Sequence, residues 1–276
     1  MQNEYTIFFD DVDVRTLGLL FLAGHSNPLL SGTRDRDTTI AGRNGSLDFG
    51  ADLDPINFNL PLYINTNNPV HLQAKAREVK DILLDANGKP RTFKLKFGYE
   101  PDKYYNVRVT GNIPIERIFA RSGRFNLPLI CHEGYALSIS KNEDILWGSE
   151  IIVFASDYSM GNTSGGNSSK TFTSTGTMDI EVIGNNVKPI IHITGSGTNV
   201  TLNFNGKTMT LGTFTNTTWL IDLDEYVAIK NGVNGLSSIG GSWLTMQLVE
   251  GDNIVTVGGT GLNLEVSVEF NDRWYG

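Results

Sequence analysis

The side chains best suited to chemistry are acids and tryptophans in the second half of the chain. Asp222, Asp224 and Glu225 lie within one short segment, and Trp219 and Trp243 stand near it in the sequence. A glycosidase needs two carboxyl groups that flank the scissile bond, whereas a lectin needs aromatic faces and hydrogen-bonding groups. The same residues would be ordinary in a β-protein, with the tryptophans in the core and the acids on turns. The pattern leaves sugar cleavage, sugar binding and a structural role open.

The histidines, the cysteine and the glycine-rich segments do not form a catalytic or metal-binding pattern. The histidines do not have metal-ligand spacing, and neighbouring strand positions such as 131 and 132 point to opposite faces; they are His25, His71, His132 and His192. The single cysteine, Cys131, lies in an apolar segment and is expected in the core. The chain has no nucleophile elbow or phosphate loop, and the glycines at 258–261 join two expected strands. The sequence therefore predicts no enzyme, no bound metal and no cofactor.

The amino-acid composition limits the number of domains and the cellular compartment in which the chain can fold. The chain has 276 residues, of which 39% are hydrophobic, enough for two ordinary domains or one large β domain. One cysteine excludes an internal disulfide and fits a reducing compartment. The longest apolar run, 17–24, is too short to cross a bilayer, and the start of the chain lacks a basic signal-peptide region. We expect folding in a reducing cytoplasm and no membrane partner.

The net charge of −8 is distributed unevenly. Residues 1–140 hold 16 acidic and 16 basic side chains, whereas residues 141–276 hold 14 acidic and 6 basic ones. Ten of the eleven arginines lie in the first part. Arginine is enriched where surfaces are buried against protein partners, so the first part is the better candidate for assembly. Since its acids balance its bases, it does not resemble a phosphate-binding surface.

Residues 40–50 predict a protruding hairpin. Asn44-Gly45 is a strong signal for a tight type I′ turn, and Gly42 and Gly50 bracket it. Arg43 beside the tip would hold a planar, permanently charged group where it can reach a partner. On turn chemistry alone, an ordinary exposed hairpin explains the same residues.

The first part otherwise predicts strands and one helix. Expected strands cover 5–9, 12–22, 56–64, 92–99, 104–111, 115–120 and 124–131. A helix is expected over 69–85, because Asn68 can cap it and apolar residues recur at helical spacing. Residues 159–169 are rich in Gly, Ser and Asn and predict a mobile joining loop.

The second part predicts a β-sandwich. Short strands are expected at regular spacing over 178–183, 190–194, 199–204, 207–211, 219–222, 244–248, 253–258 and 264–270. Asn205-Gly206, between two alternating runs, predicts a second hairpin turn. We therefore expect an N-terminal domain over 1–140 and a C-terminal domain over 141–276.

Several of these segments together resemble one family. Residues 40–50 resemble the Pro-Gly-Arg-Asp/Asn-Gly hairpin of distal tail proteins (Dit) of siphovirus-type bacteriophages that infect Gram-positive bacteria, with Ala41 in place of the proline. Residues 188–193, the pair of strands around Asn205-Gly206, residues 250–257 and the end of the chain resemble that family's galectin-like C-terminal domain. The order of the pieces makes the match specific.

The resemblance implies an architecture and a function. The fold would be mostly β, with a β-sandwich-like, ring-forming N-terminal domain that carries one α-helix and a galectin-like C-terminal β-sandwich. The protein would be a virion component at the tail tip, a homohexameric baseplate hub that takes part in tail assembly and host adsorption. Its partners would be the tail tube protein and a tail-associated lysin, tail fibre or receptor-binding protein, with DNA only passing through the lumen.

The residues that would build this hub remain candidates. The proposed subunit contacts are Arg34, Arg36, Arg43, Asn44, Gly45, Lys75, Arg77 and Lys80, and the acids available near the lumen are Asp10, Asp11, Asp13, Asp48, Asp52 and Asp54. The alternative is a lectin-like module that contacts host cell-wall polysaccharide through Trp219 or Trp243. A secreted glycosidase is a third class, against which the missing signal peptide counts.

Overall fold

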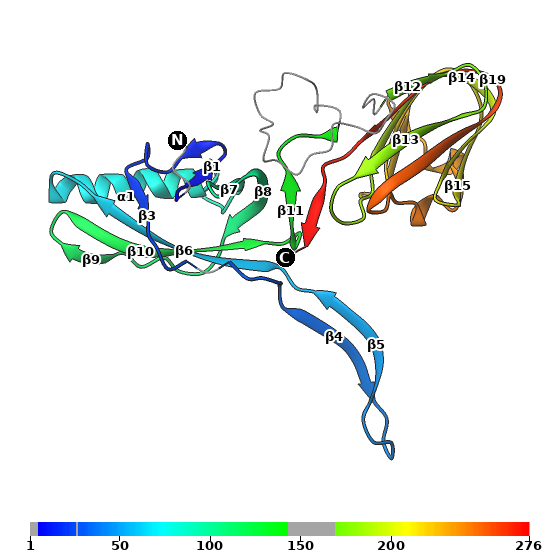
Figure 1. The fold of residues 1–276 in the computed structure, drawn as a ribbon. Coiled ribbons are helices and arrows are strands. Elements are labelled where there is room, and N and C mark those ends of the chain that lie inside the picture. Colours follow the sequence, from blue (N-terminus) through cyan, green and yellow to red (C-terminus); the bar gives the residue numbers. More distant parts are fainter. Residues whose placement is uncertain (1–4, 26, 143–168, 276) are drawn as a thin grey trace. The chain divides into compact units, whose positions relative to one another are not determined.

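The computed structural model describes residues 5–25, 27–142 and 169–275, and the joining loop expected at 159–169 lies outside them except for Ser169. The chain divides into two compact units (Figure 1). Unit 1 contains Met1–Leu137 and Tyr275–Gly276, and unit 2 contains Ser138–Trp274. Both units are mostly β, and the described residues contain one α-helix, as the sequence predicted.

An antiparallel sheet in the strand order β2-β1-β7-β8-β10-β6-β3 forms the body of unit 1. Strand β9 pairs with β10, and β11 pairs with β8. The strands are β1 (Ile7–Phe9), β2 (Val12–Asp13), β3 (Leu19–Phe21), β6 (Ile56–Asn65), β7 (Thr92–Phe97), β8 (Glu100–Val109), β9 (Glu116–Phe119), β10 (Ser122–Cys131) and β11 (Tyr135–Ser138). Two further strands, β4 (Thr33–Thr39) and β5 (Ser46–Leu53), make a separate ribbon.

Side chains alternate between the core and solvent along the central strands of unit 1. Five apolar residues of β6, from Ile56 to Ile64, are buried at every second position, and the residues between them are more exposed. Helix α1 (Pro69–Leu83) covers the core with Leu72, Val79 and Leu83. Its cap is as predicted, because the Asn68 side chain accepts a hydrogen bond from the Val70 amide at 3.0 Å. Cys131 is fully buried, and burial raises the pKa of its thiol.

Unit 2 is one eight-stranded sheet that curls around a single core. Its strands are β12 (Ser169–Phe172), β13 (Gly176–Val182), β14 (Ile190–Phe204), β15 (Lys207–Asp222), β16 (Val227–Lys230), β17 (Val233–Asn234), β18 (Gly240–Gly241) and β19 (Gly251–Glu269). The short strand β20 (Arg273–Tyr275) belongs to the other, ten-stranded sheet. Two 3-10 turns, η2 (Leu236–Ser238) and η3 (Trp243–Thr245), lie between β17 and β19. Residues 244–248, expected as a strand, include part of η3.

Three pairs of expected short strands are each one long, bent strand. Strand β14 spans the two segments expected at 190–194 and 199–204, and β15 and β19 likewise join two expected strands each. Pairing shifts register between Gly195 and Val200, where the strand changes direction. Gly195 has φ +138°, and a Cβ there would lie 2.0 Å from the Asn263 carbonyl oxygen, so the bend requires glycine. Each bend lets both halves of a strand face the same core.

The turn predicted at Asn205-Gly206 is confirmed. Phe204 pairs with Lys207, and both central residues have positive φ, 49° and 80°. This backbone geometry is that of a type I′ hairpin turn, whose twist matches the flanking strands.

Asp272, a buried acidic residue, ties the end of unit 2 to its start through its backbone. The Asp272 amide donates to the Ser138 hydroxyl at 3.0 Å, and the Ser138 amide donates to the Asp272 carbonyl at 3.0 Å. The Asp272 side chain accepts from the Ile183 amide at 2.9 Å. Burial raises the pKa of Asp272 to about 6, with a further contribution from the charge of Glu181. The carboxyl group is therefore more basic in the folded chain than in the unfolded one.

The raised pKa of Asp272 predicts how the stability of unit 2 changes with pH. A folded pKa above the unfolded value means that the protonated form stabilises unit 2, fully below about pH 4 and less as pH rises through about 6. Asp272→Asn keeps an oxygen for the Ile183 amide and removes the buried charge. We expect it to raise the free energy of unfolding at pH 7.5 by up to about 3 kcal/mol, with little change at pH 4. Urea unfolding at both pH values measures this, and an equal effect at both would contradict it.

Candidate assembly surface

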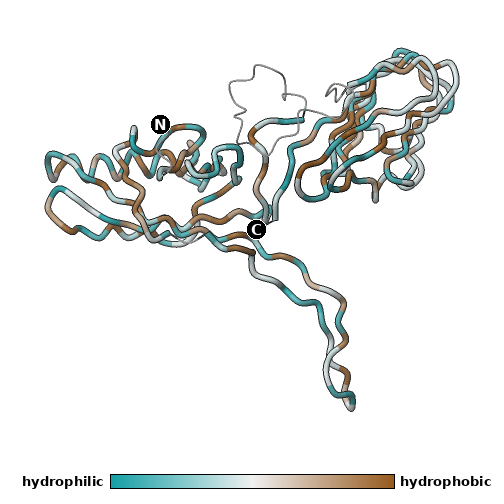
Figure 2. Tube along the Cα trace, viewed as in Figure 1, coloured by the Kyte–Doolittle hydropathy of each residue, from teal (hydrophilic) through white to brown (hydrophobic). Residues whose placement is uncertain are grey.

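The ribbon β4–β5 has no core of its own. Its two strands pair only with each other, every residue of β4 is exposed, and most residues of β5 are as well. Figure 1 shows the ribbon leaving the sheet of unit 1 as a separate extension. Hydrophobic and hydrophilic stretches both occur along it (Figure 2). A two-stranded ribbon of this kind is marginally stable in water without a further surface to pack against.

The tip of the ribbon differs from the expected tight turn. The strands end at Thr39 and Ser46, so six residues form the loop rather than two. The Arg43 amide donates to the Ile40 carbonyl at 3.1 Å, and Gly42 and Gly45 take positive φ while Asn44 does not. A type I′ turn needs positive φ at both central residues, so the prediction for Asn44-Gly45 was wrong. Gly42 supplies the left-handed residue instead, and the reversal is wider.

The charges of the ribbon are only partly matched. Asp52 forms an ion pair with Arg36 and a longer one, at 3.8 Å, with Arg34, its cross-strand neighbour. Asp37 lies directly opposite Asp48, and within the described residues neither forms an ion pair with a base. Like charges directly opposite each other destabilise a pair of strands. The ribbon thus carries one uncompensated acidic pair on its shaft.

Apolar and cationic groups along the ribbon and at its tip are also exposed. Phe49 is 66% exposed, and Ile40 and Leu53 are exposed as well. Arg43 is exposed, and no ion pair to it occurs in the described part of the chain. Exposed aromatic rings and guanidinium groups are typical of the residues that dominate protein–protein contacts.

The helix cations expected to join the ribbon lie elsewhere. Lys75 packs against the backbone at Gly18 and pairs with Glu78 at 2.7 Å, and Lys80 pairs with Asp81 at 3.2 Å. Arg77 is exposed. Figure 1 shows α1 and the ribbon at different ends of unit 1. The structure therefore brings Arg34, Arg36 and Arg43 together on one extension but does not add the three helix residues to it.

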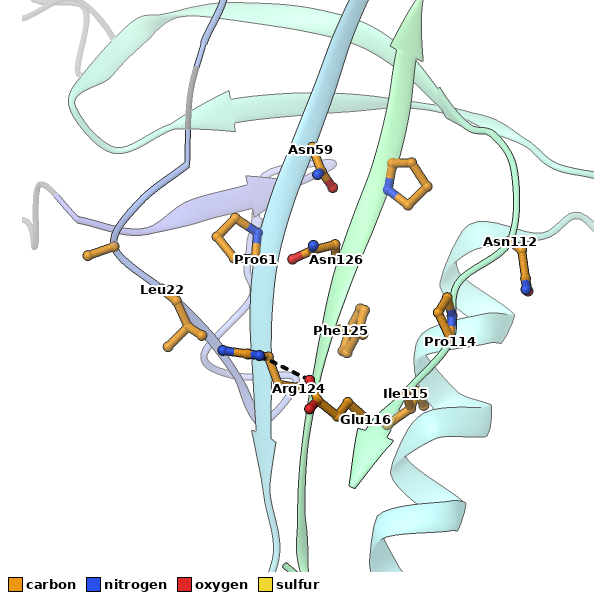
Figure 3. Close-up of a pocket in the computed structure, with 12 residues that line it drawn as sticks. Leu22, Asn59, Pro61, Asn112, Pro114, Ile115, Glu116, Arg124, Phe125 and Asn126 are labelled. Carbon is orange, nitrogen blue, oxygen red and sulfur yellow. Dashed lines mark hydrogen bonds and ion pairs between the residues drawn. The ribbon is translucent and has the colours of Figure 1, made fainter. Parts of the chain in front are cut away.

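A groove on the outer face of β6 and β10 was not found from the sequence. It has a volume of about 710 Å³, and its floor pairs Pro61 with Asn126 and Asn59 with Pro128 across the two strands (Figure 3). Leu22 and Ala23 line one side, and Asn112, Pro114, Ile115 and Glu116 line the other. Prolines at outward positions of two strands, each opposite an asparagine, were the available signal.

The groove offers hydrogen-bonding groups as well as apolar surface. No hydrogen bond to the side-chain amides of Asn59, Asn112 or Asn126 occurs within the described residues, whereas Arg124 donates to Glu116 at 3.0 Å (Figure 3). Free amides beside proline rings suit an extended polypeptide, whose backbone needs donors and acceptors.

The two tryptophans named for the lectin-like alternative have different environments. Trp219 is fully buried in the core of unit 2, so the expectation that it could contact a sugar is wrong. Its alternation with outward residues along β15 placed it inside. Trp243 lies on η3, is partly buried and packs against the same core with part of its ring still accessible.

The described residues contain no group of three or more His, Cys, Asp or Glu side chains that could hold a metal ion. In that same part of the chain, no helix has the length and apolar character needed to cross a membrane.

The comparisons with known proteins agree with this geometry. Residues 12–131 match the family model of the phage tail protein RIFT-related domain. The crystal structure of the Dit protein (gp 19.1) of phage SPP1 matches with a TM-score of 0.68 and 13% identity over 98% of this chain and 98% of that one. Comparison with curated proteins gave no match.

Two baseplate structures match less well. A chain of the phage P2 baseplate in its activated conformation with calcium has a TM-score of 0.41 and 9% identity, over 93% of this chain and 92% of that one. The corresponding structure with strontium has a TM-score of 0.43 and 10% identity, over 94% and 92%.

The SPP1 protein is described as a hub of the adsorption apparatus of phages that infect Gram-positive bacteria. Its fold extends over both units of this chain, which confirms at the level of fold the resemblance to distal tail proteins. The family match lies wholly within unit 1, which carries the ribbon and the groove. Residues 12–131 therefore match the phage tail protein RIFT-related domain family, and the chain as a whole has the fold of the SPP1 Dit protein.

Proposed function

We propose that this protein is a distal tail hub: six copies close a ring through unit 1, join the tail tube to the baseplate or tip, and leave a lumen for DNA. The observation that carries the proposal is the ribbon β4–β5, an extension without a core inside a unit of the phage tail family. The further partners are the tail tube protein and a tail-associated lysin, tail fibre or receptor-binding protein. The protein would work in the virion, at the tail tip.

A ring needs two different surfaces on each subunit, because every contact in a closed ring joins one face of a copy to another face of the next. The ribbon and the groove on β6 and β10 are such a pair. The ribbon offers free strand edges and exposed apolar side chains, and the groove offers free amides and proline surface. In this arrangement the groove of one copy receives an extended segment of its neighbour.

The uncompensated charges of the ribbon also favour a neighbour. The Asp37–Asp48 pair needs a cation that the described part of the same chain does not supply, and Arg43 needs an acceptor. A contact between copies can satisfy both groups at once. Arginine is suited to this because its planar group donates several hydrogen bonds in a fixed geometry.

Arg43→Ala tests the contact. Since Arg43 is exposed and its side chain forms no ion pair within the described residues, its removal should change the free energy of unfolding by less than about 0.5 kcal/mol. If the guanidinium is buried between copies, the ring should dissociate at a protein concentration at least about tenfold higher. Light scattering on a sizing column over a dilution series measures this.

Arg77→Ala on α1 is the matched control. Arg77 is also exposed, but it lies away from the ribbon, so its removal should leave the dissociation concentration unchanged. Equal weakening by both substitutions would place the helix face in the contact, and rings of unchanged stability with Arg43→Ala would rule the ribbon tip out.

The ribbon should also report assembly through its backbone. In the single chain the outer edges of β4 and β5 are unpaired, so amides over 33–53 should exchange with deuterium quickly. If the ribbon packs on a neighbour, ring formation should slow exchange there at least about tenfold. Hydrogen-exchange mass spectrometry of diluted and assembled protein measures this, and β7 provides an internal reference. Unchanged exchange over 33–53 would contradict the proposed contact.

DNA should pass the ring without binding to it. Within the described residues, Arg15, Arg34, Arg36, Arg91 and Arg124 already form ion pairs with acids. Four of the six acids named for the lumen, Asp10, Asp11, Asp13 and Asp52, are also paired. A surface so matched releases few counterions from a duplex. We expect no gel shift of duplex DNA at low salt, and clear retardation would contradict a lumen free of unpaired bases.

A further inference from the structure

Asn-Gly pairs are the positions of this chain where the backbone can react with its own side chain. The sequence contains five of them, Asn44-Gly45, Asn87-Gly88, Asn205-Gly206, Asn231-Gly232 and Asn234-Gly235. The glycine nitrogen can attack the side-chain carbonyl carbon of the asparagine, because glycine has no side chain to block the approach. The reaction needs a free side-chain amide, a free backbone N–H and a segment that can change its dihedral angles. Folding therefore decides which of the five pairs stays reactive.

Hydrogen bonds hold both reacting groups of Asn205-Gly206. The Asn205 side-chain amide donates to the Asn253 side-chain oxygen at 2.8 Å, and the Gly206 amide donates to the Asn203 side-chain oxygen at 3.2 Å. The pair also lies in a tight turn between β14 and β15. The turn keeps the glycine nitrogen and the asparagine carbonyl carbon from meeting.

The other two pairs of unit 2 are held through the asparagine side chain. The Asn231 side-chain oxygen accepts from the Thr218 amide at 2.8 Å, and the Asn234 side-chain oxygen accepts from the Leu236 amide at 3.0 Å. A carbonyl group fixed in this way cannot rotate toward the following nitrogen without losing its hydrogen bond.

Asn87-Gly88 is held through the backbone. The Gly88 amide donates to the Asp85 carbonyl at 2.9 Å, and the Asp85 side chain accepts from the amides of Asn87 and Lys89, both at 2.8 Å. The nitrogen that would attack is thus engaged in the turn that follows α1.

Asn44-Gly45 has neither kind of restraint. Both residues are exposed in the six-residue loop at the tip of the ribbon, and a Cβ at Gly45 would meet nothing within 4 Å. Within the described residues, no hydrogen bond forms at the Asn44 side chain or at the Gly45 amide; the backbone hydrogen bond of this loop joins Arg43 to Ile40. The loop is carried by β4 and β5, which pair only with each other. Its reacting groups are free, and the loop can rearrange around them.

We propose that Asn44 is a site of spontaneous deamidation, and that this modification limits the time during which an unassembled copy can join a ring. The Gly45 nitrogen loses its proton to solvent and attacks the Asn44 side-chain carbonyl carbon. A C–N bond forms, the bond to the side-chain nitrogen breaks, and that nitrogen takes a proton from solvent and leaves as ammonia. Water then opens the five-membered succinimide ring. Opening at the side-chain carbonyl gives aspartate, and opening at the main-chain carbonyl gives isoaspartate, in which the backbone runs through the side chain.

The effect on assembly rests on the proposed function. Either product adds a carboxylate next to Arg43, and isoaspartate also lengthens the backbone of the loop. In the proposed ring the Arg43 guanidinium needs an acceptor on the neighbouring copy, and a carboxylate on the adjoining residue competes for it. The new charge would also have to leave water when the contact forms. Conversely, a tip that is packed against a neighbour lacks the freedom to react, so assembly protects Asn44.

The first test follows the reaction in the full chain at mildly alkaline pH and at a protein concentration below that of ring formation. Digestion and mass spectrometry measure the loss of ammonia and the formation of isoaspartate at all five pairs. We expect Asn44 to react at least about tenfold faster than any of the other four asparagines, because only its groups are free to meet. In guanidinium chloride the fold is lost, and the five rates should become similar.

Two results of this test would overturn the site. One is a rate at Asn44 that is no faster than at another pair in the folded chain. The other is an advantage of Asn44 that persists unchanged in guanidinium chloride, because local sequence rather than the fold would then explain it. Neither result depends on whether a ring forms.

The second test measures the effect on assembly. Asn44→Asp introduces the new charge directly, and Asn87→Asp is the matched control at an exposed pair that is not on the ribbon. Asn44→Asp should raise the concentration at which the ring dissociates at least about fivefold, whereas Asn87→Asp should leave it unchanged. If Arg43→Ala weakens the ring but Asn44→Asp does not, the effect on assembly is wrong and the proposed contact stands. If neither substitution weakens the ring, the effect on assembly fails together with the proposed contact, and the measured rates alone decide the modification site.

Discussion

A two-stranded ribbon cannot bury its own side chains, and this constraint shapes unit 1. In the ten-stranded sheet each central strand gains two neighbours and a covered face, whereas β4 and β5 gain only each other. The hydrogen bonds between two strands do not offset the entropy of ordering them unless side chains are also removed from water. Natural edge strands are usually short, charged or covered, which prevents unwanted pairing. The ribbon is charged but long, and its Phe49 remains exposed. Such a feature is consistent with a chain that acts as a member of an assembly.

Unit 2, unlike the ribbon, encloses a core, and it does so with only a few long strands. Strands β14, β15 and β19 each bend and contribute to both halves of the curled sheet, so three strands supply most of the core. The bends require close backbone approach, as at Gly195, and no side chain would fit there. Because its backbone is fixed by long-range pairing, this unit can hold a strained residue such as Tyr226, whose φ is +55°. A local cost of about 1 to 3 kcal/mol is tolerable when the surrounding pairing determines the loop.

The sequence predicted the parts that local chemistry determines. The helix cap at Asn68, the turn at Asn205-Gly206 and the alternation along β6 follow from residue type and period, and all were found. The ribbon was predicted from its glycines, but its tip was not, because Gly42 and Asn44-Gly45 offer competing turns and the strand ends decide between them. The sequence predicts two short strands where the structure has one bent strand. The reason is that a period-two pattern does not show whether an intervening glycine ends a strand or bends it. The groove and the Tyr226 conformation depend on contacts between distant segments, such as Pro61 with Asn126, that a periodic pattern does not contain.

The uneven distribution of charge along the chain corresponds to a difference between the two units. Unit 1 has matched numbers of acids and bases, and five of its ten arginines form ion pairs with acids within the described residues. Unit 2 carries the excess of acids, which keeps its surface soluble and repels nucleic acid. Of its few basic residues, Lys188 and Arg273 both lie at the loop that holds Tyr226. Two of the six basic residues among 141–276 therefore lie at one loop with an exposed aromatic residue, whereas the exposed arginines Arg34, Arg36 and Arg43 lie on the ribbon of unit 1.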